Sequence, residues 1–435
     1  MAGTEIGLGG LAVLLVLILL RVPIGISLIT VSFGGIWVLL GPRPAWGILT
    51  AIPHDFATSW ALTSVPMFLL MGFFCYQAGL TTGLFDAARK WLSVLPGGLA
   101  IASIFGSAGF AAVTGSSVAC AAAMGKIAVP EMFRYGYDGR LATGTVAAAG
   151  TIGALIPPSI IMIIYGIFAQ VPITQLFLGG IIAGLLTAAG YVIVVLVVAT
   201  LRPDLAPPVE ERVSYAERIA ALGEVWPVLL LIAGVFGGLF SGVFTPTEAG
   251  AAGALLSVLI AALKRTLTLT ALRDALSETA RTTAAVFIIA IGASLLTRFL
   301  TLSGVGKFLS AYVISLGADP LVLMLGIALM YLVLGLFLEP IGAMLLTIPV
   351  LLPIMHSTGM SLVWFGVVVT KFLEIGMITP PIGLNVFVIK GVVGDLVTTT
   401  RIFYGVLWFL IADLVVVALL MAFPQIVLYL PELLG

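Results

Sequence analysis

The strongest constraint on the fold is a segment that occurs twice. Residues 130–158 align without a gap on residues 353–381, which lie 223 positions further along the chain. Both copies carry the pattern Ile-Gly-x-x-x-Pro-Pro, ending at Pro158 and Pro381, and Pro130 aligns with Pro353. Proline accounts for only 23 of 435 residues, so three aligned prolines are hard to obtain by chance. The chain is therefore predicted to contain an internal duplication.

The composition places this duplication in a membrane. Hydrophobic residues make up 61% of the chain and charged residues 9%, whereas soluble domains are usually about 25% charged. Apolar runs compatible with membrane spans lie near 6–20, 24–40, 61–80, 97–113, 117–133, 141–170, 174–200, 223–243, 246–263, 282–301, 320–338, 340–355, 362–394 and 403–423. The first two runs are interpreted as spans and not as a cleaved leader. The predicted fold is an all-α, polytopic integral membrane protein.

Few residues point to other chemistry. The net charge is zero, so no basic tract indicates nucleic-acid binding. Cys75 and Cys120 lie in apolar runs and are interpreted as packing residues. His54 and His356 are isolated, so neither zinc nor haem is expected.

Charged connections predict the orientation of the two copies. The basic connections at 89–90, 126–140, 202–218 and 264–281 are placed in the cytoplasm. Residues 97–133 must then form a re-entrant hairpin with its tip at 114–117, and residues 320–355 a second hairpin that enters from outside with its tip at Glu339 and Pro340. The connection at 356–361 carries no formal charge, whereas the matching one carries Arg134 and Arg140. We therefore predict inverted repeats.

Two amphipathic segments and one polar segment complete the predicted layout. Residues 83–95 and 304–316 mix charged and apolar residues at helical spacing, as interfacial helices do. Residues 201–222 form the only long polar stretch and are interpreted as a linker.

Each copy contains two backbone breaks, a hairpin tip and a Pro-Pro helix. Proline removes an amide donor and frees a carbonyl, which is costly in a membrane unless a partner takes it up. A sodium ion is such a partner, and helix N-termini at the break favour an anion. A kink or close helix packing is the structural alternative. The predicted ion-site residues are Gly115, Ser116, Ser117, Gly153, Ile156 and Pro158 in one copy, and Gly335, Gly376, Thr379 and Ile382 in the other.

Five residues are predicted to contact substrate. They are Ser116, Ser117, Glu339, Asn385 and Arg298. The alternatives were a helix-capping role for the serines and Glu339, and an interfacial position for Arg298.

Three further charges have structural interpretations or none. Lys371 and Glu374 are expected to form an ion pair along one helix, and Glu248 to cap a helix start. Asp413 has no predicted role.

These motifs resemble the large membrane subunit, DctM-like, of tripartite ATP-independent periplasmic (TRAP) transporters. The resemblance covers essentially the whole chain and rests on the Gly-Ser-Ser tip at 115–117, Pro-Glu-Met at 130–132, Gly-Ala-Leu-Ile-Pro-Pro-Ser at 153–159, Glu-Pro-Ile-Gly at 339–342 and Thr-Pro-Pro-Ile-Gly-Leu-Asn at 379–385. It implies sodium-driven import of a small organic acid, such as a C4-dicarboxylate or sialic acid, in the bacterial inner membrane. At least two sodium ions are expected, held mainly by main-chain carbonyls.

The resemblance also implies partners and an elevator mechanism. The partners are a small four-helix membrane subunit, expected as a separate chain, and a periplasmic substrate-binding protein. The mobile repeats would span 82–173 and 282–395. The scaffold would comprise 1–81, 174–281 with the linker at 201–222, and 396–435.

Two rival functions are compatible with a polytopic membrane protein. A stand-alone sodium/carboxylate symporter or sodium/proton antiporter would need no binding protein. An intramembrane enzyme would need a nucleophile with a base or a pair of carboxylates, and no such arrangement stands out in the sequence. The chain is therefore not expected to be an enzyme.

Overall fold

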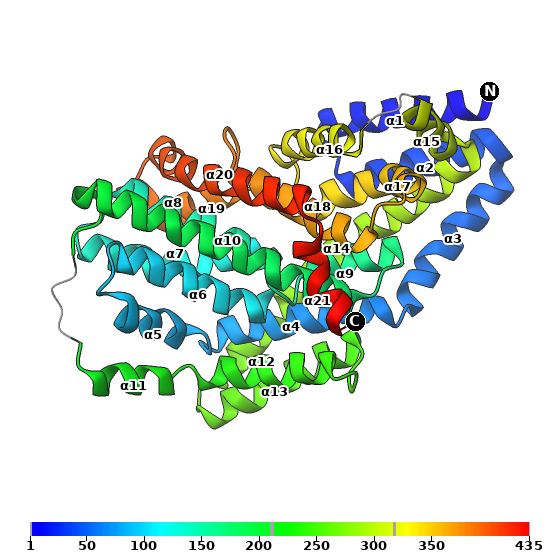
Figure 1. Cartoon of the computed structure of the whole chain (residues 1–435). Coiled ribbons are helices and arrows are strands. Elements are labelled where there is room, and N and C mark those ends of the chain that lie inside the picture. Colours follow the sequence, from blue (N-terminus) through cyan, green and yellow to red (C-terminus); the bar gives the residue numbers. More distant parts are fainter. Residues whose placement is uncertain (1, 209–212, 316–318, 435) are drawn as a thin grey trace.

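A computed structural model describes residues 2–208, 213–315 and 319–434, and every regular element in these ranges is a helix (Figure 1). The middle of the predicted linker, 209–212, and residue 316 of the second amphipathic segment lie outside the described residues. Five helices are long and apolar enough to cross a membrane, and two bent helix pairs bring the number to seven. The polytopic membrane fold predicted from the sequence is thus confirmed.

The two copies of the repeat contain corresponding helices. An amphipathic helix, a helical hairpin and an interrupted helix follow one another in each. In the first copy these are α5 (Thr82–Leu92), α6 (Gly98–Thr114), α7 (Ser117–Arg134), α8 (Gly139–Gly150), η2 (Thr151–Ala154) and α9 (Ile160–Ala169). In the second they are α15 (Val305–Ser315), α16 (Pro320–Gly335), α17 (Pro340–Thr358), α18 (Leu362–Gly376), α19 (Leu384–Val393) and η4 (Gly394–Leu396). The Pro157-Pro158 and Pro380-Pro381 peptide bonds are both cis.

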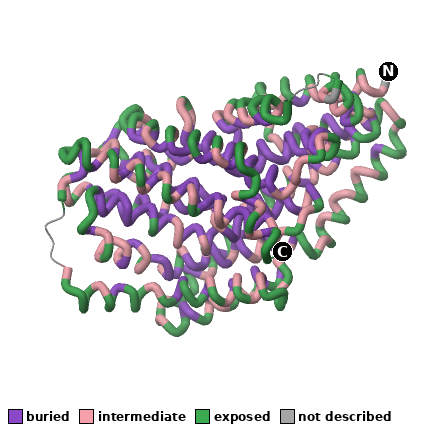
Figure 2. The backbone as a smooth tube through the Cα atoms, viewed as in Figure 1, coloured by how far each residue is buried: buried purple, intermediate pink, exposed green. Residues whose placement is uncertain are grey.

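The broken helices interlock the two copies. After its break, α9 packs against α17 and α18 of the second copy. After the other break, α19 packs against α7 and α8 of the first. Every residue of α8 is buried except its first two, and buried residues gather in these central helices (Figure 2). The two copies therefore share their cores, which an alignment of one copy on the other does not reveal.

The remaining helices surround this centre. They are α1 (Ala2–Leu19), α2 (Ile24–Leu40), α3 (Pro42–Thr58), η1 (Ala61–Thr63), α4 (Ser64–Gln77), α10 (Ile173–Leu201), η3 (Pro203–Leu205), α11 (Tyr215–Gly223), α12 (Trp226–Phe240), α13 (Pro246–Leu263), α14 (Leu269–Ser303), α20 (Thr399–Ala422) and α21 (Gln425–Leu434). The long α14 packs against α2 and α4, and α20 packs against α8. Helix α13 begins with a capping box between Thr245 and Glu248, which confirms the predicted capping role of Glu248.

Three helices and the start of a fourth were not predicted from the sequence. Helix α3 contains Arg43, His54 and Asp55, which lower its hydropathy, and it meets α4 at a bend of 61°. Helix α11 occupies the end of the segment interpreted as a linker, and α21 follows the last predicted span. The predicted span at 282–301 is only the end of α14, which begins at Leu269. All four segments are amphipathic or polar, so a search for apolar runs overlooks them.

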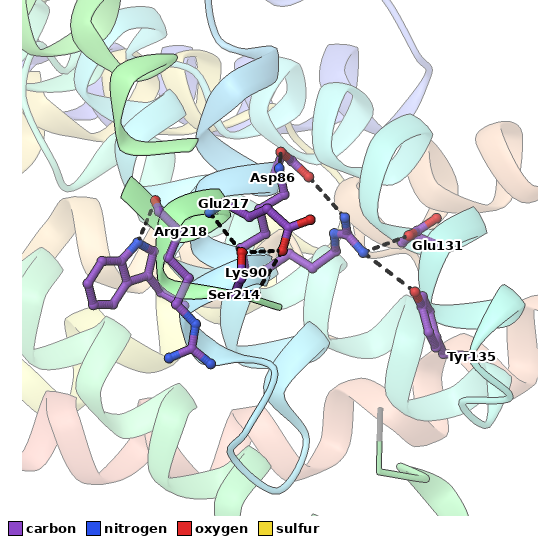
Figure 3. Close-up of polar contacts among 9 residues, drawn as sticks. Asp86, Lys90, Glu131, Tyr135, Ser214, Glu217 and Arg218 are labelled. Carbon is purple, nitrogen blue, oxygen red and sulfur yellow. Dashed lines mark hydrogen bonds and ion pairs between the residues drawn. The ribbon is translucent and has the colours of Figure 1, made fainter. Parts of the chain in front are cut away.

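The amphipathic helix α5 is held by polar contacts on two sides (Figure 3). Arg89 reaches Glu131 on α7 at 3.5 Å and Asp86 on its own helix at 3.1 Å. The indole N–H of Trp91 donates to the carbonyl of Arg218 on α11 at 3.1 Å. Partial burial opposes ionisation of Asp86, but its contacts with Lys90 and Arg89 outweigh this and lower its pKa. This stabilisation is present above the ordinary pKa of an aspartate and is lost as the pH falls through the lowered value.

A buried ion pair joins α18 to α20. The ammonium group of Lys371 binds the carboxylate of Asp413, and both side chains are fully buried. The hydroxyl of Tyr191 on α10 donates to Asp413 at 2.8 Å and also lies 3.1 Å from the hydroxyl of Thr151. The predicted pair between Lys371 and Glu374 is therefore wrong, because each side chain finds a partner on another helix. The ion pair with Lys371 also gives Asp413, for which the sequence predicted no role, a structural role.

Removing one member of this pair should be more damaging than removing both. Lys371→Met leaves Asp413 buried and uncompensated, which should cost about 3–5 kcal/mol of stability. Lys371→Met combined with Asp413→Leu should recover much of that loss. The melting temperature of the purified protein in detergent measures both effects. Lys307→Met, at an exposed lysine, is the control and should be neutral. A double variant as unstable as the single one would contradict this account.

Candidate functional site

At the first hairpin tip, the chain turns directly beside the first broken helix. Gly115 ends α6 with φ +62°, and the hydroxyl of Ser116 caps α7 by accepting from the amide of Ala119. A Cβ atom on Gly115 would overlap the carbonyl oxygen of Pro158. One on Gly153 would lie 2.9 Å from the carbonyl oxygen of Ser116. Glycine is needed at both positions because backbone meets backbone there.

The second tip meets the second break in the same way. A Cβ atom on Gly335 would lie 2.9 Å from the Cα of Gly376, and one on Gly376 would lie 2.8 Å from the Cα of Gly335. The carboxylate of Glu339 caps α17 by accepting from the amides of Ile341 and Gly342. The structure thus brings together the tip and the break that the sequence paired in each copy.

Both breaks leave main-chain carbonyls available. Among the described residues, no backbone or side-chain donor reaches the carbonyls of residues 155–158 or 378–382. The side chain of Thr379 is already used, because its hydroxyl donates to the carbonyl of Ile375 at 2.7 Å. Ile156, Pro158 and Ile382 have no ligating side chain. Any cation at these residues must therefore be held by main-chain oxygens.

A cavity of about 360 Å³ connects the two tips. Gly115, Ser116 and Ser117 line it from one hairpin and Glu339 from the other. Glu278 and Thr282 of α14 and Glu374 of α18 also face it. The N-termini of α7 and α17 meet here, and helix N-termini attract anions. The cavity is thus a place where an anionic group and the two tips can meet.

Glu374 belongs to this cavity and was not predicted as a site residue. Its Oε2 atom accepts from the hydroxyl of Ser117 at 2.6 Å, so it ties the second broken helix to the first hairpin tip. A signal was present in the sequence, since a charge two residues before Gly376 on a membrane helix is a functional suspect. Glu374 was not considered a site residue because it was expected to pair with Lys371.

Two predicted substrate residues lie apart from the cavity. Asn385 is fully buried and donates to the carbonyl of Ala147 on α8 at 3.2 Å. Arg298 faces a separate cavity of about 420 Å³, together with Asp55 and Gln170. Neither lines the cavity between the tips, so their contact with substrate stays a prediction.

The donor set suits a hard monovalent cation better than a transition metal. The described residues contain no group of three or more His, Cys, Asp or Glu side chains placed to hold a metal ion. Carbonyl and hydroxyl oxygens are abundant at the tips and breaks, and hard cations prefer oxygen ligands.

Several known proteins are similar to this chain in sequence. The family described as "Tripartite ATP-independent periplasmic transporter, DctM component" matches residues 11–426. The C4-dicarboxylate TRAP transporter large permease protein DctM of Pseudomonas aeruginosa is 34% identical over 379 residues, covering 86% of this chain and 87% of that protein. The sialic acid TRAP transporter large permease protein SiaM of Vibrio cholerae is 33% identical over 414 residues, covering 94% and 95%.

Solved structures of other transporters share the fold. The YdaH transporter of Alcanivorax borkumensis superposes with a TM-score of 0.63 at 16% identity, over 89% of this chain and 90% of that one. MtrF of Neisseria gonorrhoeae gives 0.60 at 17% identity, over 88% and 85%. At such low identity these two structures support the fold alone. With the family match over residues 11–426 and relatives above 30% identity, this chain belongs to the DctM component family of the tripartite ATP-independent periplasmic transporters.

Proposed function

We propose that the chain is the large permease subunit of a sodium-coupled importer of a small organic acid in the bacterial inner membrane. The observation that carries this proposal is the paired meeting of tip and break, at Gly115 with Pro158 and at Gly335 with Gly376. Each junction combines unpartnered carbonyls with a helix N-terminus. Cations and an anionic substrate can therefore bind next to one another, and each lowers the electrostatic free-energy cost of binding the other.

The transport movement we propose is an elevator movement of the two repeats. Helices α9 and α19 each pack into the core of the opposite copy, which supports a single moving body. The mobile part would include residues 82–173 and 282–395, with the copies inverted as the charge pattern predicts. The remaining helices would form the scaffold. Sodium at the tips would order them before substrate binds.

The substrate class and partners follow from the family. Relatives are named for C4-dicarboxylates and for sialic acid, and both are carboxylates. A small four-helix membrane subunit and a periplasmic binding protein are the expected partners. Carboxylate recognition agrees with the α7 and α17 N-termini at the cavity, which Ser116, Ser117 and Glu339 also line.

Replacing sodium should abolish uptake. The chain would be reconstituted into liposomes with its small subunit and the binding protein encoded beside it, and radiolabelled succinate and sialic acid would be offered as probes. We expect uptake of one probe under an inward sodium gradient and none when potassium replaces sodium. Equal uptake in potassium would contradict sodium coupling. Uptake that persists without the binding protein would instead favour a stand-alone symporter.

Adding a methyl group at the second junction should weaken sodium dependence. Gly376→Ala forces its Cβ to within 2.8 Å of the Cα of Gly335, so tip and break must separate. We expect the sodium concentration for half-maximal uptake to rise severalfold. Gly391→Ala, on the exposed side of α19 with no atom within 4 Å of the new Cβ, is the matched control. A normal sodium requirement in Gly376→Ala would count against a cation site at this junction.

A further inference from the structure

We propose that the carboxylate of Glu374 is a ligand of a coupling cation, at a site bridging the first hairpin tip and the second broken helix. The inference rests on the proposed function and adds a charged side chain to a site otherwise built from main-chain oxygens. Its starting point is an unpartnered atom. Oε2 of Glu374 accepts from Ser117, but Oε1 has no hydrogen-bond partner, although the residue is fully buried and lines the cavity between the tips.

Among the described residues, no cationic side chain forms an ion pair with this carboxylate. Lys371 lies three residues earlier on α18, but its ammonium group is bound to Asp413. An uncompensated carboxylate in a membrane interior is strongly unfavourable. A proton or a bound cation must supply the missing charge.

The cavity favours the bound cation. The charged residues that line it are Glu278, Glu339 and Glu374, and its described lining includes no Lys, Arg or His. The carboxylate of Glu339 accepts from the amides of Ile341 and Gly342 at the start of α17, and the carboxylate of Glu278 lies 3.9 Å from the guanidinium of Arg281. These two carboxylates thus have partners of their own, whereas Oε1 of Glu374 has none, so Glu374 is the member that most needs a counter-ion.

Further oxygen ligands are available close by. The Ser117 hydroxyl contacts Oε2, and the carbonyl of Ser116, which accepts from the amide of Cys120 and keeps a second lone pair, lies against Gly153. On the other side, the unpartnered carbonyls of 378–382 begin four residues after Glu374 along the chain, just past the end of α18. One carboxylate with hydroxyl and carbonyl oxygens is a suitable set for a hard monovalent cation. A cation here would link the two copies of the repeat and reduce repulsion of an anionic substrate.

The test is sodium-dependent thermal stabilisation of the purified full-length chain in lipid nanodiscs. The melting temperature would be titrated with NaCl at constant ionic strength, with choline chloride as the balance, at two pH values. Glu374→Gln keeps the shape and the contact to Ser117 but removes the charge. We expect the half-maximal sodium concentration to rise roughly tenfold or more. Glu248→Gln, which preserves the exposed capping box on α13, should match the unmodified chain.

A second variant keeps the test informative if Glu374→Gln does not fold. Ser117→Ala leaves the charge in place but removes the hydrogen bond that orients it, so a smaller rise in the sodium requirement is expected. If Glu374→Gln fails to fold, an unchanged sodium titration in both Ser117→Ala and Glu374→Asp overturns the proposal.

The outcomes also separate the two proposals. Sodium stabilisation that is identical in the unmodified chain and in Glu374→Gln overturns the role of Glu374 and leaves sodium coupling intact. Loss of only the pH dependence in Glu374→Gln assigns a proton to this carboxylate and likewise overturns the role. Absence of any sodium effect in the unmodified chain, together with uptake in potassium, overturns the proposed function itself.

Discussion

A helix that stops inside a membrane leaves carbonyl groups that water cannot reach, and the centre of this protein follows from that constraint. Two hairpin tips and two Pro-Pro breaks interrupt four helices. Amide groups freed at these interruptions are satisfied locally, because the side chains of Ser116, Ser159 and Glu339 accept from amides of the helices that follow them. The carbonyls of 155–158 and 378–382 are not. Their need for a positive partner gives the protein a physical reason to bind a cation where two helical segments meet.

The same interruptions also join the two copies. Each broken helix is interrupted at its proline pair, and its second part packs against helices of the opposite copy. Three hydrogen bonds cross between the copies in this region. Ser117 donates to Glu374, Asn385 to the carbonyl of Ala147, and Tyr165 to the carbonyl of Leu362. If a cation binds at one junction as proposed, its effect would reach the other through these packed helices, without a separate element to transmit it.

The sequence predicted the membrane class, the duplication, both hairpins and both breaks, because proline and glycine mark those features directly. It did not predict partners that come from distant helices. Lys371 and Glu374 are three residues apart, and spacing alone suggested that they pair. Only the fold brings Asp413 to Lys371 and Ser117 to Glu374. Helices α3 and α11 were missed for a related reason, since their polar residues interrupt the long apolar run that identifies a span.

The central claim is that sodium orders the tip of the first hairpin, and thiol labelling at that tip tests it most directly. Val118 is exposed and lines the cavity, whereas Cys75 and Cys120 are buried and should react slowly with a polar maleimide. In the Val118→Cys variant, labelling should slow severalfold as NaCl replaces KCl, over the concentration range that stabilises the protein. The same labelling rate in NaCl and KCl would contradict sodium binding at the tip.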